Sequence, residues 1–193
     1  MNIAIFLYDD AEVLDFAGPF EVFNTAKRLA RPDWNVFLIA ENSELITARG
    51  GMLVQPHYSI NSHPPIDVLL VAGGVHQPQM GNQSVLDWIS QVAESAHKVA
   101  SVCTGAFLLA QAGLLDGLNV TTHWEDIAEL QGTFPSLKVI SQRKWVDQGK
   151  FITSGGISAG MDMSLHLVSQ LASLELASLT ATQMEYRWSN ILP

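Results

Sequence analysis

Cys103 is the only cysteine in this chain of 193 residues, and it is the side chain best suited to nucleophilic chemistry. It follows an apolar stretch, Lys98–Val102, typical of a buried strand, and precedes a run over 106–112 typical of a helix. A nucleophile at such a turn needs small residues two positions before and after it, and Ser101 and Gly105 provide them. Because the helix start favours a thiolate, we expect a reactive thiol. A buried structural cysteine is the alternative.

Asp15 is the candidate acid–base group. It lies in the largely apolar segment 13–20, where a carboxylate is costly to bury unless it is paired. The alternative is that Asp15 caps the helix that follows, a common use of aspartate. Glu21, six residues further on, is expected to be a solvated helix residue.

Backbone donors are predicted at two glycine-containing turns. Gly74 follows an apolar run over 67–72, and its N–H and that of Thr104 form a candidate oxyanion-stabilising pair. Gly155, Gly156 and Ile157 precede a helix expected from residue 158. The alternative is that these glycines only turn the chain.

The elements that position these residues alternate between strand and helix. This alternation predicts a single α/β domain over 1–193, a three-layer sandwich with a mostly parallel central sheet and the cysteine at a nucleophile elbow. Sites in such sheets form at the carboxyl ends of the strands. We expect strands at 3–7, 34–40, 67–72, 98–102, 119–122, 137–140, 144–147 and 151–153, a hairpin over 46–54, and helices at 13–29 (kinked or restarted at Gly18-Pro19), 84–96, 106–112, 124–131, 158–171 and 176–187.

Composition narrows the function classes. The net charge of −9 argues against nucleic acid or an anionic membrane surface as a partner. One cysteine allows no intrachain disulfide and, with no signal peptide or membrane-spanning run, favours a cytoplasmic protein. The six histidines are scattered without metal-ligand spacing, so we expect no metal site.

Five motifs together resemble the ThiJ/PfpI superfamily, which has the class I glutamine-amidotransferase-like, flavodoxin-like fold. The chain is most similar to isonitrile hydratases and to the sensor domains of AraC-type regulators. The matching motifs are Leu14-Asp-Phe-Ala-Gly-Pro19, Val71-Ala-Gly-Gly74, Ser101-Val-Cys-Thr-Gly105, Thr121-Thr-His-Trp124 and Thr153-Ser-Gly-Gly-Ile-Ser-Ala-Gly-Met-Asp162.

The resemblance implies a role for each matching residue. Cys103 is the nucleophile, Asp15 is its carboxyl partner, and Thr104 positions the site. His123 falls where several relatives place a histidine near the site, although a packing role is the other interpretation. The resemblance also implies a homodimer that acts on a small molecule without a cofactor.

Two departures narrow the activity. PfpI-type proteases have a histidine directly after the nucleophile, and this chain has Thr104, which disfavours peptidase activity. Glyoxalase- and deglycase-like members have glutamate where this chain has Asp15, and a carboxylate one methylene shorter reaches differently for proton transfer.

The resulting hypothesis is hydration of an isonitrile to an N-substituted formamide through a thioimidate on Cys103. Asp15 carries the proton, and the two groups share one proton between them. A small-molecule or redox-sensing domain without turnover is the alternative from another class. A glyoxalase- or deglycase-like stress enzyme, which would form lactate from methylglyoxal, is a third.

Overall fold

A seven-stranded sheet forms the centre of the computed structural model, which describes residues 1–188. The last five residues of the expected 1–193 domain lie outside the described residues. The strand order is β10-β11-β7-β6-β1-β2-β5, and every neighbouring pair is parallel except β10 and β11. The predicted α/β class with a mostly parallel sheet is therefore confirmed. The strands are β1 (Asn2–Phe6), β2 (Asn35–Ala40), β5 (Tyr58–Ser59), β6 (Val68–Val71), β7 (Lys98–Val102), β10 (Trp145–Gln148) and β11 (Phe151–Ser154).

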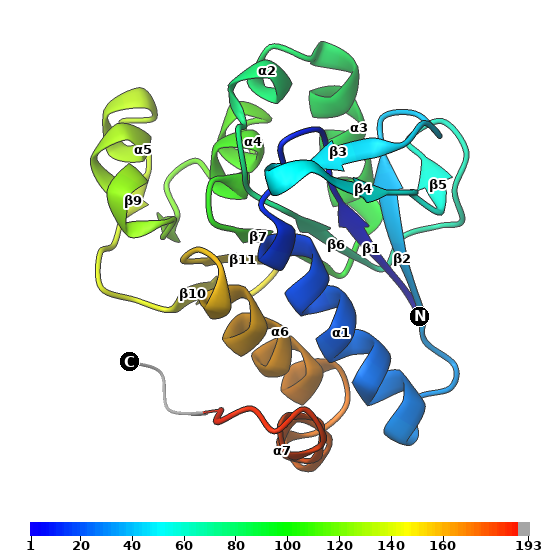
Figure 1. Cartoon of the computed structure of the whole chain (residues 1–193). Helices are drawn as coiled ribbons and strands as arrows, with labels where there is room; N and C mark the ends of the chain where they lie inside the picture. Colours follow the sequence, from blue (N-terminus) through cyan, green and yellow to red (C-terminus); the bar gives the residue numbers. More distant parts are fainter. Residues whose placement is uncertain (189–193) are drawn as a thin grey trace.

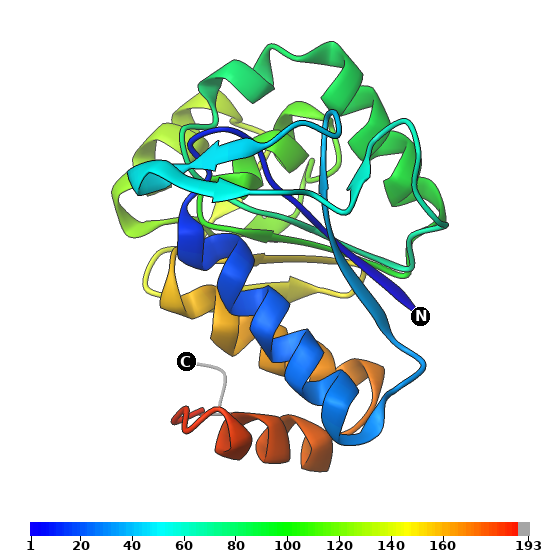
Figure 2. The ribbon, with the colours of Figure 1, turned by 45° about the vertical axis from the view of Figure 1, so that its right-hand side comes forward.

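Alternation along the strands produces two hydrophobic layers, one on each face of the sheet. Ile3 and Ile5 of β1 pack into one layer, while Ala4 and Phe6 pack into the other. Helices cover both layers, as Figures 1 and 2 show. These helices are α1 (Val13–Ala30), α6 (Ser158–Leu171) and α7 (Leu174–Gln183) on the first face, and α2 (Gln77–Met80), α3 (Gln83–Ser95), α4 (Gly105–Gln111) and α5 (Ile127–Thr133) on the second.

Smaller elements lie beyond the carboxyl edge of the sheet. The expected hairpin consists of β3 (Ile46–Ala48) and β4 (Met52–Val54), joined by a short 3₁₀ turn, η1 (Arg49–Gly51). A second two-stranded sheet pairs β8 (Asn119–Val120) with β9 (Lys138–Val139), and a 3₁₀ turn, η2 (Trp124–Asp126), leads into α5. Arg49 of η1 and Glu125 and Asp126 of η2 line the cavity at the site.

Helix α1 continues through Pro19, so the helix does not restart at Gly18-Pro19, one of the two predicted outcomes. Proline removes one backbone hydrogen bond from a helix, so continuity requires compensation from packing. Gly18 supplies a close approach, since a Cβ at this position would lie 2.9 Å from Met161 Cγ of α6. Tight packing of α1 on α6 therefore offsets the local cost of Pro19.

The last helix also differs, because α7 begins two residues earlier and ends four residues earlier than expected. The side chain of Ser173 accepts a hydrogen bond from Leu176 N–H at 3.1 Å and so caps the helix start. Glu185, just past the end, has a positive φ of 51°. Among the described residues, no helix combines the length and apolar character that crossing a membrane requires.

Candidate active site

Cys103 sits at a strained turn between β7 and α4. Its φ is 56°, a conformation that residues other than glycine rarely adopt, and its thiol-bearing side chain is 9% exposed. A Cβ on Gly105 would collide with the Val71 carbonyl oxygen, so the turn requires glycine there. The sulfur is not enclosed in the core, because Cys103 lines a cavity of about 490 Å³.

The turn is held from the side by the Thr-Thr-His-Trp segment. The hydroxyl of Thr122 donates a hydrogen bond of 2.8 Å to the Cys103 carbonyl oxygen. Thr121 N–H donates to Thr153 Oγ1 at 2.8 Å, which ties the same segment to β11. These contacts give the two threonines a structural role and fix the position of His123, the next residue in the chain.

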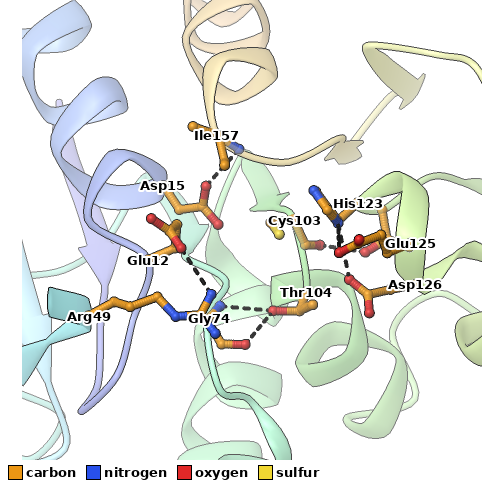
Figure 3. A network of polar contacts seen from close by, with 11 residues as sticks. Glu12, Asp15, Arg49, Gly74, Cys103, Thr104, His123, Glu125, Asp126 and Ile157 are labelled. Atoms are coloured by element: carbon orange, nitrogen blue, oxygen red, sulfur yellow. Dashed lines mark hydrogen bonds and ion pairs between the residues drawn. The ribbon is translucent and has the colours of Figure 1, made fainter.

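Asp15 lies behind the sulfur and is fully buried in the first turn of α1. Its Oδ1 accepts a hydrogen bond of 2.9 Å from Ile157 N–H, while its Oδ2 has no hydrogen-bond partner among the described residues. A Cβ on Gly73 would lie 2.7 Å from each of three atoms, namely Asp15 Oδ2, Cys103 Cβ and Thr104 N. Glycine at position 73 therefore allows the carboxylate and the cysteine to converge (Figure 3).

Ile157 holds Asp15 from a strained position. Its φ is 57° and its ψ is −108°, an outlier for a β-branched residue, and it precedes the first turn of α6. The neighbouring Gly156 is packed tightly, since a Cβ there would lie 3.0 Å from Cys103 Sγ and 2.6 Å from His123 Cδ2. The Gly155-Gly156-Ile157 turn thus contributes a donor to Asp15 and leaves room for the sulfur.

Thr104 and Gly74 form two hydrogen bonds with each other. Gly74 N–H donates to Thr104 Oγ1 at 2.8 Å, and the Thr104 hydroxyl donates to the Gly74 carbonyl oxygen at 2.9 Å. The Gly74 N–H that we expected to face an oxyanion is therefore occupied by a side chain. Thr104 N–H lies beside the cysteine, where it lowers the pKa of the Cys103 thiol.

Burial changes the protonation of the Cys103–Asp15 pair. Burial is the main cause that raises the pKa of the Cys103 thiol, and the charge of Asp15 is the second. A hydrogen bond from Thr104 N–H lowers this pKa and offsets only part of the rise. Burial raises the pKa of Asp15 to about 6, against the lowering effect of the Ile157 hydrogen bond. From the sequence we expected the start of the helix to favour a thiolate. The structure disfavours the thiolate, because the short helix cannot offset desolvation and the nearby carboxylate. The pair holds one proton near neutral pH.

An acidic wall faces the sulfur from the other side of the cavity. His123 Nδ1 lies 3.6 Å from Asp126 Oδ2 and 3.8 Å from Glu125 Oε2 (Figure 3). Asp126 and Glu125 were missed in the sequence. Their only signal was proximity to His123 in the chain, which a solvated turn would show equally.

The hairpin supplies the third wall. Arg49 Nη1 forms an ion pair with Glu12 Oε2 at 3.0 Å, and both side chains line the cavity. Sequence reasoning missed both residues, because nothing local indicates that η1 folds over the carboxyl end of β1. His76 also lines the cavity and is 3% exposed.

The fold and this geometry define a class of protein, the α/β domains that present a cysteine at a strained elbow beside a buried carboxylate. The family model that matches residues 1–170 is the DJ-1/PfpI family, and the chain belongs to this family.

The relatives of this chain include both an enzyme and a transcriptional regulator. An isonitrile hydratase from Pseudomonas putida is 33% identical over 96% of this chain and 78% of its own length. The HTH-type transcriptional regulator GbdR from Pseudomonas aeruginosa is 28% identical over 96% of this chain, which spans only 50% of that regulator.

Solved structures agree on the fold. A THiJ/PfpI family protein from Pseudomonas syringae superposes with a TM-score of 0.87 at 26% identity, covering 97% of this chain and 76% of that one. DJ-1beta from Drosophila melanogaster superposes with a TM-score of 0.84 at 18% identity, covering 97% and 98%. These likenesses establish the three-layer architecture around the cysteine.

Proposed function

We propose that this protein hydrates an isonitrile, R–N≡C, to the formamide R–NH–CHO, with Cys103 as nucleophile and Asp15 as proton carrier. One observation supports this most directly: the sulfur lines an open cavity while a fully buried carboxylate lies behind it. The 33% identity to an isonitrile hydratase supports the same reaction.

The first step joins sulfur to the terminal carbon of the isonitrile. Asp15 takes the proton from the Cys103 thiol as the sulfur attacks, and passes it to the same carbon. The product is the thioimidate Cys103–S–CH=N–R, with no atom gained or lost. Asp15 suits this relay because its Oδ2 has no hydrogen-bond partner among the described residues and lies on the same side of Gly73 as the Cys103 side chain.

The second step adds water to the thioimidate carbon and expels the sulfur. Water donates one proton towards nitrogen and leaves its oxygen on carbon, and the released sulfur regains a proton through Asp15. Asp15 is buried behind the cysteine, so the water must arrive from the cavity side, where His123 and Asp126 lie. The overall change is R–NC plus H₂O to R–NH–CHO, and it requires no cofactor.

The assembly is a further part of the proposal. We infer a cytoplasmic homodimer acting on a small molecule, as the family resemblance implies. Light scattering should give twice the mass of the chain. A monomer that still forms formamide would reject the dimer and leave the chemistry intact.

The decisive experiment measures formamide from a panel of aliphatic and aromatic isonitriles, with a chelator present throughout. Wild-type protein should turn over at least one member, and Cys103→Ser should not. The same panel is tested for binding by calorimetry. Formamide from neither protein, with or without binding, would reject the proposal.

A sensing function is the second candidate, and the 28% identity to a transcriptional regulator over almost the whole chain favours it. In that case the cavity binds a small molecule and the cysteine does not turn over. Tight binding with no formamide would select the sensor.

A further inference from the structure

Three different ligand types meet in front of the elbow, although the sequence showed no metal-ligand spacing. One donor atom from each of Cys103, His123 and Asp126 lies within 4.8 Å of the other two. Figure 3 shows the imidazole and the two carboxylates of η2 turned towards one another beside the cysteine. Thiolate, imidazole and carboxylate are the three donor types that bind Zn²⁺ in proteins.

The spacing of these donors suits a small tetrahedral cation. With Zn–N and Zn–O distances near 2.0–2.2 Å and Zn–S near 2.3 Å, adjacent ligand atoms lie about 3.3–3.6 Å apart. His123 Nδ1 and Asp126 Oδ2 are 3.6 Å apart, too long for a hydrogen bond and close to a tetrahedral edge. Moving the third donor from within 4.8 Å to about 3.6 Å requires a shift of roughly 1 Å. Small side-chain rotations achieve such a shift.

A second observation comes from His76, which lines the same cavity. Its side chain is 3% exposed, and its Nε2 has no hydrogen-bond partner among the described residues. Burial lowers the pKa of His76, which favours the neutral imidazole with a lone pair to offer. The wall of this cavity therefore contains a further unpartnered imidazole nitrogen, a donor of the type that binds Zn²⁺.

The charges of the cavity favour a cation. Its wall includes the carboxylates of Glu12, Glu125 and Asp126. Among the described residues that line the cavity, Arg49 is the one Lys or Arg side chain, and it is already paired with Glu12. An anionic ligand would meet net repulsion at the acidic wall. A divalent cation would relieve it.

We propose that Cys103, His123 and Asp126 form a Zn²⁺ site that blocks the nucleophile reversibly. Binding exchanges the thiol proton for the metal, so Cys–SH and Zn²⁺ give a zinc–thiolate and one H⁺ released to solvent. The ion occupies the position that a substrate carbon needs, and removal of the ion restores the thiol. Metal binding at these residues stands independently of the proposed hydration, whereas the block of a substrate rests on it.

The test uses the full chain freed of metal by chelation and then titrated with Co²⁺, a spectroscopic substitute for Zn²⁺. A thiolate-to-cobalt charge-transfer band in the near ultraviolet should appear at one equivalent and disappear when Zn²⁺ is added. Cys103→Ser should abolish the band, and Asp126→Asn should weaken Zn²⁺ affinity about tenfold or more.

Glu129→Gln is the matched control, because it removes one carboxylate charge from the exposed side of the adjacent helix α5. It should change affinity less than twofold. Co²⁺ binding without the band, or equal loss of affinity in Asp126→Asn and Glu129→Gln, would overturn the proposal. The band in a protein that forms no formamide would retain the metal site and reject only the hydration.

Discussion

Two aspartates approach the same sulfur from opposite sides, and their surroundings are different. Asp15 is fully buried, bonded to a strained backbone N–H, and its pKa is raised to about 6. Asp126 is partly exposed on the cavity wall, and its Oδ2 lies 3.6 Å from Nδ1 of His123. We propose that the buried side manages one proton and that the open side meets a ligand.

The largest effect is expected when the sulfur itself is replaced. Cys103→Ser keeps the size of the side chain but substitutes a far weaker nucleophile, so turnover should fall by about 10⁴-fold or more. Single-turnover formation of formamide measures this. Serine should also leave the melting temperature near that of wild type, which separates lost chemistry from lost folding. A serine variant within tenfold of wild type would show that the sulfur does not form the covalent bond.

The next largest effect should come from the buried aspartate. Asp15→Asn preserves an oxygen to accept the Ile157 N–H but removes the group that carries the proton, so kcat should fall by roughly 10²–10⁴-fold. Glu21→Gln is the control, because Glu21 lies on the exposed side of the same helix. It should leave kcat unchanged. Equal rates for the two variants would remove Asp15 from the mechanism.

Cys103 and Asp15 also show how much of the site the sequence could predict. Apolar, β-branched runs such as Val68–Val71 predicted the parallel strands, and Ser101 and Gly105 predicted the elbow. Both predictions succeeded because the sequence signals are local. The burial of Asp15 against Cys103 was predicted through family resemblance, since the two lie 88 positions apart. The raised pKa of the thiol was not predicted, because it results from desolvation that only the folded packing determines.

The open side was the least predictable part of the molecule. Asp126 and Arg49 belong to short 3₁₀ turns, and which cavity such a turn faces depends on contacts distant in the chain. Pro19 shows the same limit within a helix, where local chemistry predicted a kink or a restart and the helix instead continues where it packs closely against α6. Sequence patterns therefore located the cysteine elbow and the parallel strands better than the residues that line the open wall of the cavity.

The pH dependence of the free energy of unfolding should show the burial of Asp15 without any measurement of activity. A folded pKa of about 6 against an ordinary value of 3.8 means that the folded state favours protonated Asp15. This contribution is fully present below pH 3.8 and is lost as the pH rises through 6, at a cost of about 3 kcal/mol. Asp15→Asn should thus be more stable than wild type at pH 8 by up to about 3 kcal/mol, and nearly equal at pH 4.

Urea unfolding of both proteins, with a chelator present, measures that difference. Burial raises the pKa of the neighbouring Cys103 thiol, so this thiol stays protonated across the range from pH 4 to pH 8 and does not obscure the comparison. A stability difference that does not change between pH 4 and pH 8 would mean that Asp15 is not protonated preferentially in the folded state.

The smallest effect is expected at the open wall. Asp126→Asn removes a charge that lines the cavity without lying behind the sulfur, so a contact worth about 1 kcal/mol should be lost from substrate binding. With metal chelated, KM should rise about fivefold while kcat changes little, since the proton relay through Asp15 is intact. Steady-state kinetics of Asp15→Asn and Asp126→Asn, measured side by side, provide the comparison. If Asp126→Asn instead lowered kcat as far as Asp15→Asn does, the open wall would belong to the proton relay, and the division between a chemical side and a ligand-facing side would fail.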